Sequence, residues 1–262
     1  MKETVRIEQL SIGYKEKSNS KYVACNLSAS LYEGELTCLI GSNGVGKSTL
    51  LRTLSAFLPA LKGEVLICGK SIKDYTNKEL STLIGVVLTD RCDVPQLRIK
   101  ELVGMGRNPY NDFWGRMTLK DKDAVNQALS LVQIEPLADR MIHSLSDGER
   151  QKAMIAKALA QETPIIFLDE PTAFLDFQSK IDMIRLLHRL TRQANKTIFL
   201  SSHDLELVLR LADKLWLMDN TRGIVTGTHD ELAADGTLTC FFNSDEKMNI
   251  VYDVQHRIFL FE

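Results

Sequence analysis

Short apolar runs recur along the chain and are separated by longer segments with helical spacing. The apolar runs are typical of buried strands, and they lie at 36–40, 84–88, 165–168 and 197–202. Helical patterns lie between or after them, at 50–54, 150–160 and 177–194. Because strands alternate with helices in this way, the pattern predicts an α/β fold with a mainly parallel sheet.

Both ends of the chain carry additional strand patterns. Alternating segments at 5–10 and 23–31, joined by the polar loop 15–21, and a further strand at 64–68 predict an N-terminal antiparallel β subdomain. The remaining expected elements are two closing strands, a short helix and a tail that alternates like one or two edge strands, at 215–218, 223–226, 230–234 and 249–262.

A mainly helical segment interrupts the alternation in the middle of the chain. Its clearest helices are expected at 100–105 and 121–132. A helical insertion between two α/β halves predicts a separate lobe. The expected organisation is one domain over 1–262, with a core at 1–97 and 143–235, an inserted helical lobe at 98–142 and a C-terminal extension at 236–262.

Composition narrows the class of protein. The net charge is −2 with charges mixed throughout, which argues against the basic surface that nucleic-acid binding requires. The five cysteines are scattered and lack C-x-x-C spacing, which favours reduced thiols in a cytosolic compartment. No signal segment is expected at the N terminus, and no apolar run approaches the roughly 20 residues that span a bilayer. A role at a membrane would therefore require docking to an embedded protein.

A glycine-rich turn follows the strand at 36–40 and leads into a helix. Its sequence is Gly41-Ser42-Asn43-Gly44-Val45-Gly46-Lys47-Ser48-Thr49. In this strand–turn–helix context the pattern is a P-loop, whose backbone N–H groups and helix N terminus bind phosphate. Lys47 is expected to reach the β- and γ-phosphates, and Ser48 to offer a hydroxyl to Mg²⁺. The sequence thus predicts a protein that binds a nucleoside triphosphate.

Polar residues that could act in catalysis or ligand binding directly follow two of the apolar strands. Asp169 and Glu170 directly follow 165–168, and His203 follows 197–202. The carboxyl ends of buried parallel strands are where α/β proteins bind ligands, so we expect all three at the nucleotide site. The same position favours a catalytic role for His203 over a structural one.

Three further features have two interpretations each. Ser146 or Asp147 can cap the helix 150–160, and the N terminus of that helix can also bind an anion. Tyr14 is interpreted as a packing residue at a strand end, with adenine stacking as the alternative. The aromatic cluster at 110–114 either anchors the lobe or contacts a partner.

Taken together, the motifs resemble those of an ABC-type ATPase over nearly the whole chain. They are the P-loop, Leu145-Ser146-Asp147-Gly148-Glu149, Ile166-Phe167-Leu168-Asp169-Glu170 and His203, in that order. The stretch Glu101-Leu102-Val103-Gly104-Met105-Gly106-Arg107-Asn108-Pro109 further resembles the ATP-binding subunits of importers for iron chelates, haem or cobalamin. The implied fold is a P-loop NTPase core, RecA-like, with the β subdomain and helical lobe described above.

This resemblance implies a role for each motif residue. Tyr14 would stack on adenine, and the P-loop residues 41–49 would hold the phosphates of ATP and, through Ser48, Mg²⁺. Asp169 would bind the metal, Glu170 would accept a proton from the attacking water, and His203 would touch the γ-phosphate. Ser146 and Gly148 would bind the ATP held by a second copy of the chain, and Asp176 would lie in the dimer-contact loop.

The resemblance also implies partners and a location. Two copies would close head to tail around ATP, on two integral-membrane permease subunits at the cytoplasmic face of the cell membrane, with a substrate-binding protein acting indirectly. The sequence departs from the family pattern at Thr89, where glutamine is usual, at Asp147, and at Ala173-Phe174.

Two alternatives have weaker support in the sequence. A soluble ABC ATPase that remodels ribosomes or DNA would usually carry tandem cassettes or basic arms, which the sequence lacks. A GTPase or small-molecule kinase is disfavoured because Asn195-Lys196-Thr197-Ile198 lacks the acid of a guanine-reading motif.

Overall fold

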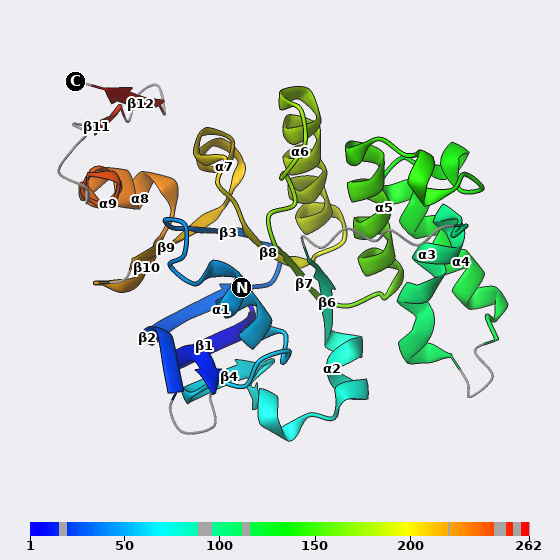
Figure 1. Ribbon diagram of the computed structural model, residues 1–262, viewed down its shortest axis with the longest axis horizontal. Helices are drawn as coiled ribbons and strands as arrows, with labels where there is room; N and C mark the ends of the chain where they lie inside the picture. The colour runs from blue at the N-terminus through cyan, green and yellow to red at the C-terminus, as the bar shows by residue number, and fades with distance from the viewer. Residues whose placement is uncertain are drawn as a thin grey trace.

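The computed structural model describes residues 1–15, 20–88, 96–111, 116–219, 221–243, 250–253 and 258–261. These residues form an antiparallel sheet, a mainly parallel sheet, a small separate hairpin and helices packed around them (Figure 1). The expected α/β architecture, with its antiparallel subdomain and its helical insertion, is confirmed.

The central sheet has six strands in the order β10-β9-β3-β8-β7-β6. Its strands are β3 (Leu36–Ile40), β6 (Ile84–Val87), β7 (Ile165–Leu168), β8 (Thr197–Ser201), β9 (Lys214–Asp219) and β10 (Gly223–Gly227). Pairing is parallel except between β9 and β10. Every residue of β3, β7 and β8 is buried, which explains why these strands are apolar runs without alternation.

The antiparallel sheet packs on one face of the core through helix α1 (Lys47–Leu54). Its order is β2-β1-β4-β5, with β1 (Glu3–Lys15), β2 (Ser20–Tyr32), β4 (Lys62–Ile67) and β5 (Lys70–Ser71). Apolar residues from β1, α1 and the central strands share one buried cluster that includes Ile7, Leu50 and Phe199. This packing fixes α1, and therefore the P-loop, between the two sheets (Figure 1).

The helical lobe lies beside β6 and β7, on the right in Figure 1. It contains α3 (Ile99–Gly104), the 3₁₀ segment Met105–Tyr110 and α4 (Leu119–Leu131). Helix α5 (Asp147–Ala160) packs against both α3 and α4. The N terminus of α5, which carries the candidate anion site, is therefore held by the lobe.

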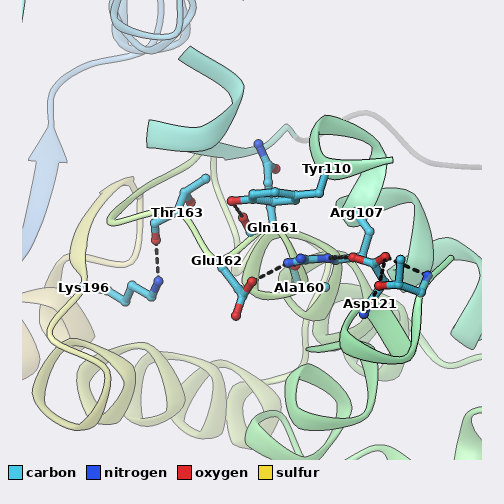
Figure 2. Close-up of polar contacts among 9 residues, drawn as sticks. Arg107, Tyr110, Asp121, Ala160, Gln161, Glu162, Thr163 and Lys196 are labelled. Atoms are coloured by element: carbon cyan, nitrogen blue, oxygen red, sulfur yellow. Dashed lines mark hydrogen bonds and ion pairs between the residues drawn. The ribbon is translucent and has the colours of Figure 1, made fainter. Parts of the chain in front are cut away.

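A buried arginine fastens the other end of α5. Arg107 is 1% exposed, and its guanidinium donates to Asp121 Oδ1 at 2.9 Å, to the Ala160 carbonyl at 2.7 Å and to Glu162 Oε2 at 2.6 Å (Figure 2). The Tyr110 ring lies 4.1 Å from this guanidinium, and its hydroxyl donates to the Gln161 carbonyl. Arg107 thus caps α5 and ties it to α4.

The aromatic cluster at 110–114 was expected either to anchor the lobe or to contact a partner, and Tyr110 now has an assigned role. Tyr110 anchors the lobe through Arg107 and Gln161, although the residue is still 42% exposed. The rest of that cluster, at 112–114, lies outside the described residues.

Helix α2 (Asn77–Leu83) packs on the same side of the central sheet as α1, because Leu80 and Leu50 share one buried cluster. Helices α6 (Phe177–Gln193) and α7 (Leu205–Leu211) contribute to the other buried cluster. The C-terminal part adds α8 (His229–Ala234) and α9 (Thr237–Phe242). No helix in the described ranges is both long and apolar enough to cross a membrane.

The tail differs from its predicted placement at the sheet edge. Strands β11 (Ile250–Asp253) and β12 (Ile258–Phe261) pair with each other in a separate sheet. Helix α9, which was not predicted, precedes them and leads the chain away from β10. Tyr252 of this hairpin packs edge to face on the His229 ring with centroids 5.1 Å apart, and this contact fastens the tail to α8.

Candidate nucleotide-binding site

The P-loop connects β3 to α1 in the expected geometry of a strand, a tight turn and a helix. Gly44 and Gly46 have φ values of 80° and 113°, in the left-handed region that favours glycine. A Cβ on Gly41 would lie 2.7 Å from the Met218 carbonyl, so this position also requires glycine. The loop can therefore curl so that backbone N–H groups and the start of α1 face one point.

Lys47 lies folded across the P-loop. Its Nζ donates to the Gly41 carbonyl at 2.8 Å and to the Ser42 carbonyl at 3.2 Å. Burial lowers the pKa of Lys47, and the nearby carboxylates of Glu170 and Asp169 oppose that shift. The ammonium group thus donates hydrogen bonds to carbonyl oxygens of the loop in which phosphate oxygens are expected to bind.

The end of β7 brings a carboxylate to the P-loop helix. Ser48 Oγ donates to Asp169 Oδ1 at 3.1 Å, and Asp169 is 6% exposed. The two residues are far apart in sequence, but β3, β8 and β7 are adjacent parallel strands whose carboxyl ends share one edge of the sheet. The structure therefore brings together the two residues predicted to bind the metal.

These two oxygen donors fit Mg²⁺. The ion is usually held by one or two protein oxygens together with substrate phosphates and water. Within the described ranges, no group of three or more His, Cys, Asp or Glu side chains could hold a metal ion. The arrangement suits an ion that arrives with a phosphate ligand better than a resident metal bound only by protein.

Glu170 and His203 form a pair at the same edge. His203 Nε2 lies 2.6 Å from Glu170 Oε1, and both side chains are partly exposed. Glu170 has a φ of 49°, in the left-handed region that costs energy for a non-glycine residue. Such strain is concentrated at functional sites, where it directs a side chain towards a ligand. The structure thus places Glu170 and His203 together, beside Asp169.

Tyr14 is at the end of β1 and contacts the P-loop helix. Its hydroxyl lies 3.3 Å from Thr49 Oγ1, and the residue is 43% exposed. The ring is therefore held beside the P-loop helix at the end of β1, with much of its surface exposed.

Ser146 and Gly148 lie in a different part of the chain from the P-loop group. Ser146 caps α5: its Oγ accepts from Glu149 N, and Glu149 Oε2 accepts from Ser146 N at 2.9 Å. This capping box confirms the capping interpretation and also leaves the helix N terminus at the surface. In the part of the chain that the structure describes, neither residue hydrogen-bonds to the P-loop.

Asp176 performs the same capping function for α6. Its carboxylate accepts from the Ser179 amide at 3.0 Å and from the Ser179 hydroxyl at 2.7 Å. The Ser179 hydroxyl in turn lies 3.5 Å from the position of a Cβ on Gly148. The predicted dimer-contact loop and the N terminus of α5 are therefore neighbours on one surface.

Some functional candidates were not found from the sequence. Ser201 contacts Asp169 and Glu170, and Asp204 accepts hydrogen bonds from Thr172 and Lys180, each at 2.6 Å. The only signal for these residues was their place beside His203. Thr89, the departure from the family glutamine, lies outside the described residues.

The geometry is that of a strand, a P-loop and a helix, and comparison with known proteins identifies the family. Residues 24–173 match the family model for the ABC transporter. The chain is 38% identical over 229 residues to the ferric enterobactin transport ATP-binding protein FepC of Escherichia coli, covering 87% of this chain and 83% of FepC. It is 34% identical over 242 residues to the iron(3+)-hydroxamate import ATP-binding protein FhuC of Bacillus subtilis, covering 92% and 88%.

A solved structure gives the same result. The dimeric structure of MJ0796, a bacterial ABC transporter cassette, superposes with a TM-score of 0.74 at 25% identity, covering 86% of this chain and 98% of MJ0796. The chain belongs to the ABC transporter ATP-binding proteins. It is the ATP-hydrolysing subunit of a transporter.

Proposed function

We propose that this chain powers the import of an iron chelate, such as a ferric siderophore, from the cytoplasmic face of the cell membrane. The observation that carries the cargo class is the similarity to FepC and FhuC, whose names specify ferric enterobactin and iron(3+)-hydroxamate. The sequence at 101–109 supports the same class, because it resembles that of metal-chelate importer subunits. In this proposal the chain forms a single cassette that binds two membrane subunits and does not contact the cargo.

The active unit in this proposal is a dimer of two identical chains. Ser146 and Gly148 present a helix N terminus that can stabilise phosphate charge, yet among the described residues neither hydrogen-bonds to the P-loop of its own chain. A second copy in head-to-tail orientation would supply them. MJ0796, a cassette of the same fold, has a dimeric structure.

Two aromatic side chains support this dimer surface. Phe174 and Phe177 flank the Asp176 cap and are 68% and 71% exposed. Phe174 also has a φ of 65°, so its backbone holds the ring in a conformation that is unfavourable for a non-glycine residue. Exposed aromatic residues of this kind are typical of protein interfaces.

The proposed reaction uses residues that the structure already pairs with one another or with the P-loop backbone. Lys47 would exchange the carbonyls of Gly41 and Ser42 for the β- and γ-phosphates of ATP. Ser48 and Asp169 would hold Mg²⁺, which when bound neutralises phosphate charge. Glu170 would accept a proton from the attacking water, and His203 would donate a hydrogen bond to the γ-phosphate.

Closure of the dimer would couple this chemistry to transport. ATP bridges the P-loop of one chain and α5 of the other, so bound ATP favours the closed dimer and hydrolysis favours opening. The free energy available to close the dimer is the difference between the binding free energies of ATP for the closed and the open arrangement.

The membrane subunits would dock in a groove beside α2 and the C-terminal part of α5. This groove has a volume of about 470 Å³, and its lining includes Leu80, Ile84, Lys157 and Gln161. Phe57, at its margin, is 58% exposed. Because one wall includes α5, an occupant of the groove would move together with the N terminus that carries Ser146.

Uptake of iron tests this function directly. In the source organism, deletion of the gene should abolish energy-dependent uptake of ⁵⁵Fe supplied as a ferric siderophore. The wild-type gene should restore uptake, whereas Glu170→Gln, expressed at the same level, should not. Unchanged uptake of every ferric chelate supplied to the deletion strain would refute the proposed cargo class.

A further inference from the structure

The last residue of β8, Ser201, places a buried hydroxyl between two acidic residues of the site. Its Oγ donates to Asp169 Oδ1 at 2.7 Å, and the Glu170 amide donates to the same Oγ at 2.9 Å. Ser201 is 0% exposed. The direction of both bonds is fixed, because an ionised carboxylate only accepts and an amide N–H only donates.

The register of the central sheet explains this contact. Strands β7 and β8 run parallel with Leu168 opposite Leu200, so the next residues along each strand, Asp169 and Ser201, are neighbours. Two residues earlier, Phe167 and Phe199 pack edge to face with ring centroids 6.0 Å apart. Side chains two positions apart in a strand share a face. The aromatic pair therefore packs on the same face of the sheet as the Ser201 hydroxyl and the Asp169 carboxylate, two residues earlier along each strand.

We propose that Ser201 is a positioning residue for ATP hydrolysis, which holds the carboxylate of Asp169 and the backbone of Glu170 in one fixed arrangement. Its bond to the Glu170 amide restrains the left-handed backbone at φ 49°, from which the Glu170 side chain projects. Its bond to Asp169 sets the direction of the carboxylate. The hydroxyl acts through these two residues.

Ser201 differs from Ser48, whose hydroxyl also contacts Asp169. Ser48 also donates to Asp169 Oδ1, at 3.1 Å, but Ser48 is exposed and is itself a candidate ligand for Mg²⁺. A metal would therefore compete for the Ser48 hydroxyl, while the buried Ser201 hydroxyl stays with Asp169. Partners behind a metal ligand commonly change metal affinity or activity about 10–100-fold when they are removed. This inference rests on the ATPase activity of the site and not on the proposed cargo.

The test compares Ser201→Ala with a rescue and a control in the purified full chain. Ser201→Thr retains the hydroxyl. Thr191→Val removes another fully buried hydroxyl, one that donates to the His188 carbonyl within α6, away from the site. Four quantities are measured: kcat for ATP, KM for ATP, the affinity for a fluorescent ADP analogue in EDTA, and the Mg²⁺ concentration that gives half of the metal-dependent increase in that binding.

Ser201→Ala should bind the ADP analogue in EDTA within about twofold of wild type, because the P-loop is intact. Its half-saturating Mg²⁺ concentration should rise about tenfold and kcat should fall about tenfold, with a much smaller change in KM. Ser201→Thr should recover both values to within about threefold. Thr191→Val should leave kcat and the Mg²⁺ requirement unchanged.

Two results with Ser201→Ala and Ser201→Thr would overturn the inference. One is a folded Ser201→Ala with the kcat and Mg²⁺ requirement of wild type. The other is a folded Ser201→Thr that is as impaired as Ser201→Ala, since the hydroxyl would then be irrelevant. If Ser201→Ala does not fold, Ser201→Cys, with its similar shape and weak donor, replaces it. Wild-type kcat and Mg²⁺ requirement in that variant would also refute the role.

Discussion

The buried ion pair between Arg107 and Asp121 gives a quantitative prediction about the lobe that carries α5. Arg107 is 1% exposed and Asp121 is 3% exposed, with 2.9 Å between Nε and Oδ1. Arg107→Met would remove the guanidinium and leave the carboxylate buried. Breaking one side of a buried pair costs about 3–5 kcal/mol. Asp121 keeps its hydrogen bonds from Thr118, so we expect a loss of about 3 kcal/mol.

A double-mutant cycle separates the pair from other effects. Asp121→Asn alone should cost about 2 kcal/mol, because an amide replaces the charged acceptor of Arg107. The double variant should be less destabilised than the sum of the single variants by about 2 kcal/mol. The free energies come from urea unfolding followed by circular dichroism, with m-values compared to verify that the same transition is measured.

An exposed pair in the same lobe provides the matched control. Lys100 Nζ lies 2.5 Å from Asp139 Oδ1, but the two side chains are 51% and 74% exposed. A cycle with Lys100→Met and Asp139→Asn should give a coupling of at most about 0.5 kcal/mol, since solvent screens such pairs. If the Arg107–Asp121 coupling is as small as this control, the reasoning that burial makes Arg107 hold α5 in the lobe is wrong.

Three further predictions concern the site, acid stability and the dimer. Lys47→Ala should retain the fold by circular dichroism but less than about a tenth of the ATPase activity, and greater activity would argue against the P-loop role. Hydrogen bonds from Thr118 hold the pKa of Asp121 at about 2, below its ordinary 3.8. Because the folded pKa is lower, about 2 kcal/mol of stability is present above pH 4 and is lost as the pH falls towards 2. Urea midpoints of Asp121→Asn should therefore fall less over that range than those of wild type. Phe174→Ser should weaken ATP-dependent dimerisation of a hydrolysis-deficient chain about tenfold in sedimentation, whereas Phe57→Ser should not.

The sequence predicts the central sheet and the P-loop well because both depend on local patterns. The apolar runs at β3, β7 and β8 are buried on both faces, so no alternation obscures them. The P-loop requires glycine at positions such as Gly46, where the backbone is left-handed. Residue spacing within one segment is enough to recognise both features.

Contacts between distant segments could not be predicted in the same way. Arg107 lies in a polar stretch with glycine and proline that resembles an exposed loop, yet its partners arrive from α4 and from the end of α5. Ser201 is one of two successive serines, and only the register of β7 and β8 distinguishes it. The tail alternates like an edge strand, but α9 leads it to a separate hairpin that packs on α8.

The central proposal is that two copies of the chain share bound ATP and that hydrolysis separates them. The most direct measurement is light scattering during gel filtration of Glu170→Gln with ATP and Mg²⁺. We predict a dimer that persists with ATP and dissociates when ADP replaces it, because the variant retains the P-loop but lacks the proposed base. A strictly monomeric Glu170→Gln at high protein concentration, or one that hydrolyses ATP at the wild-type rate, would contradict the account.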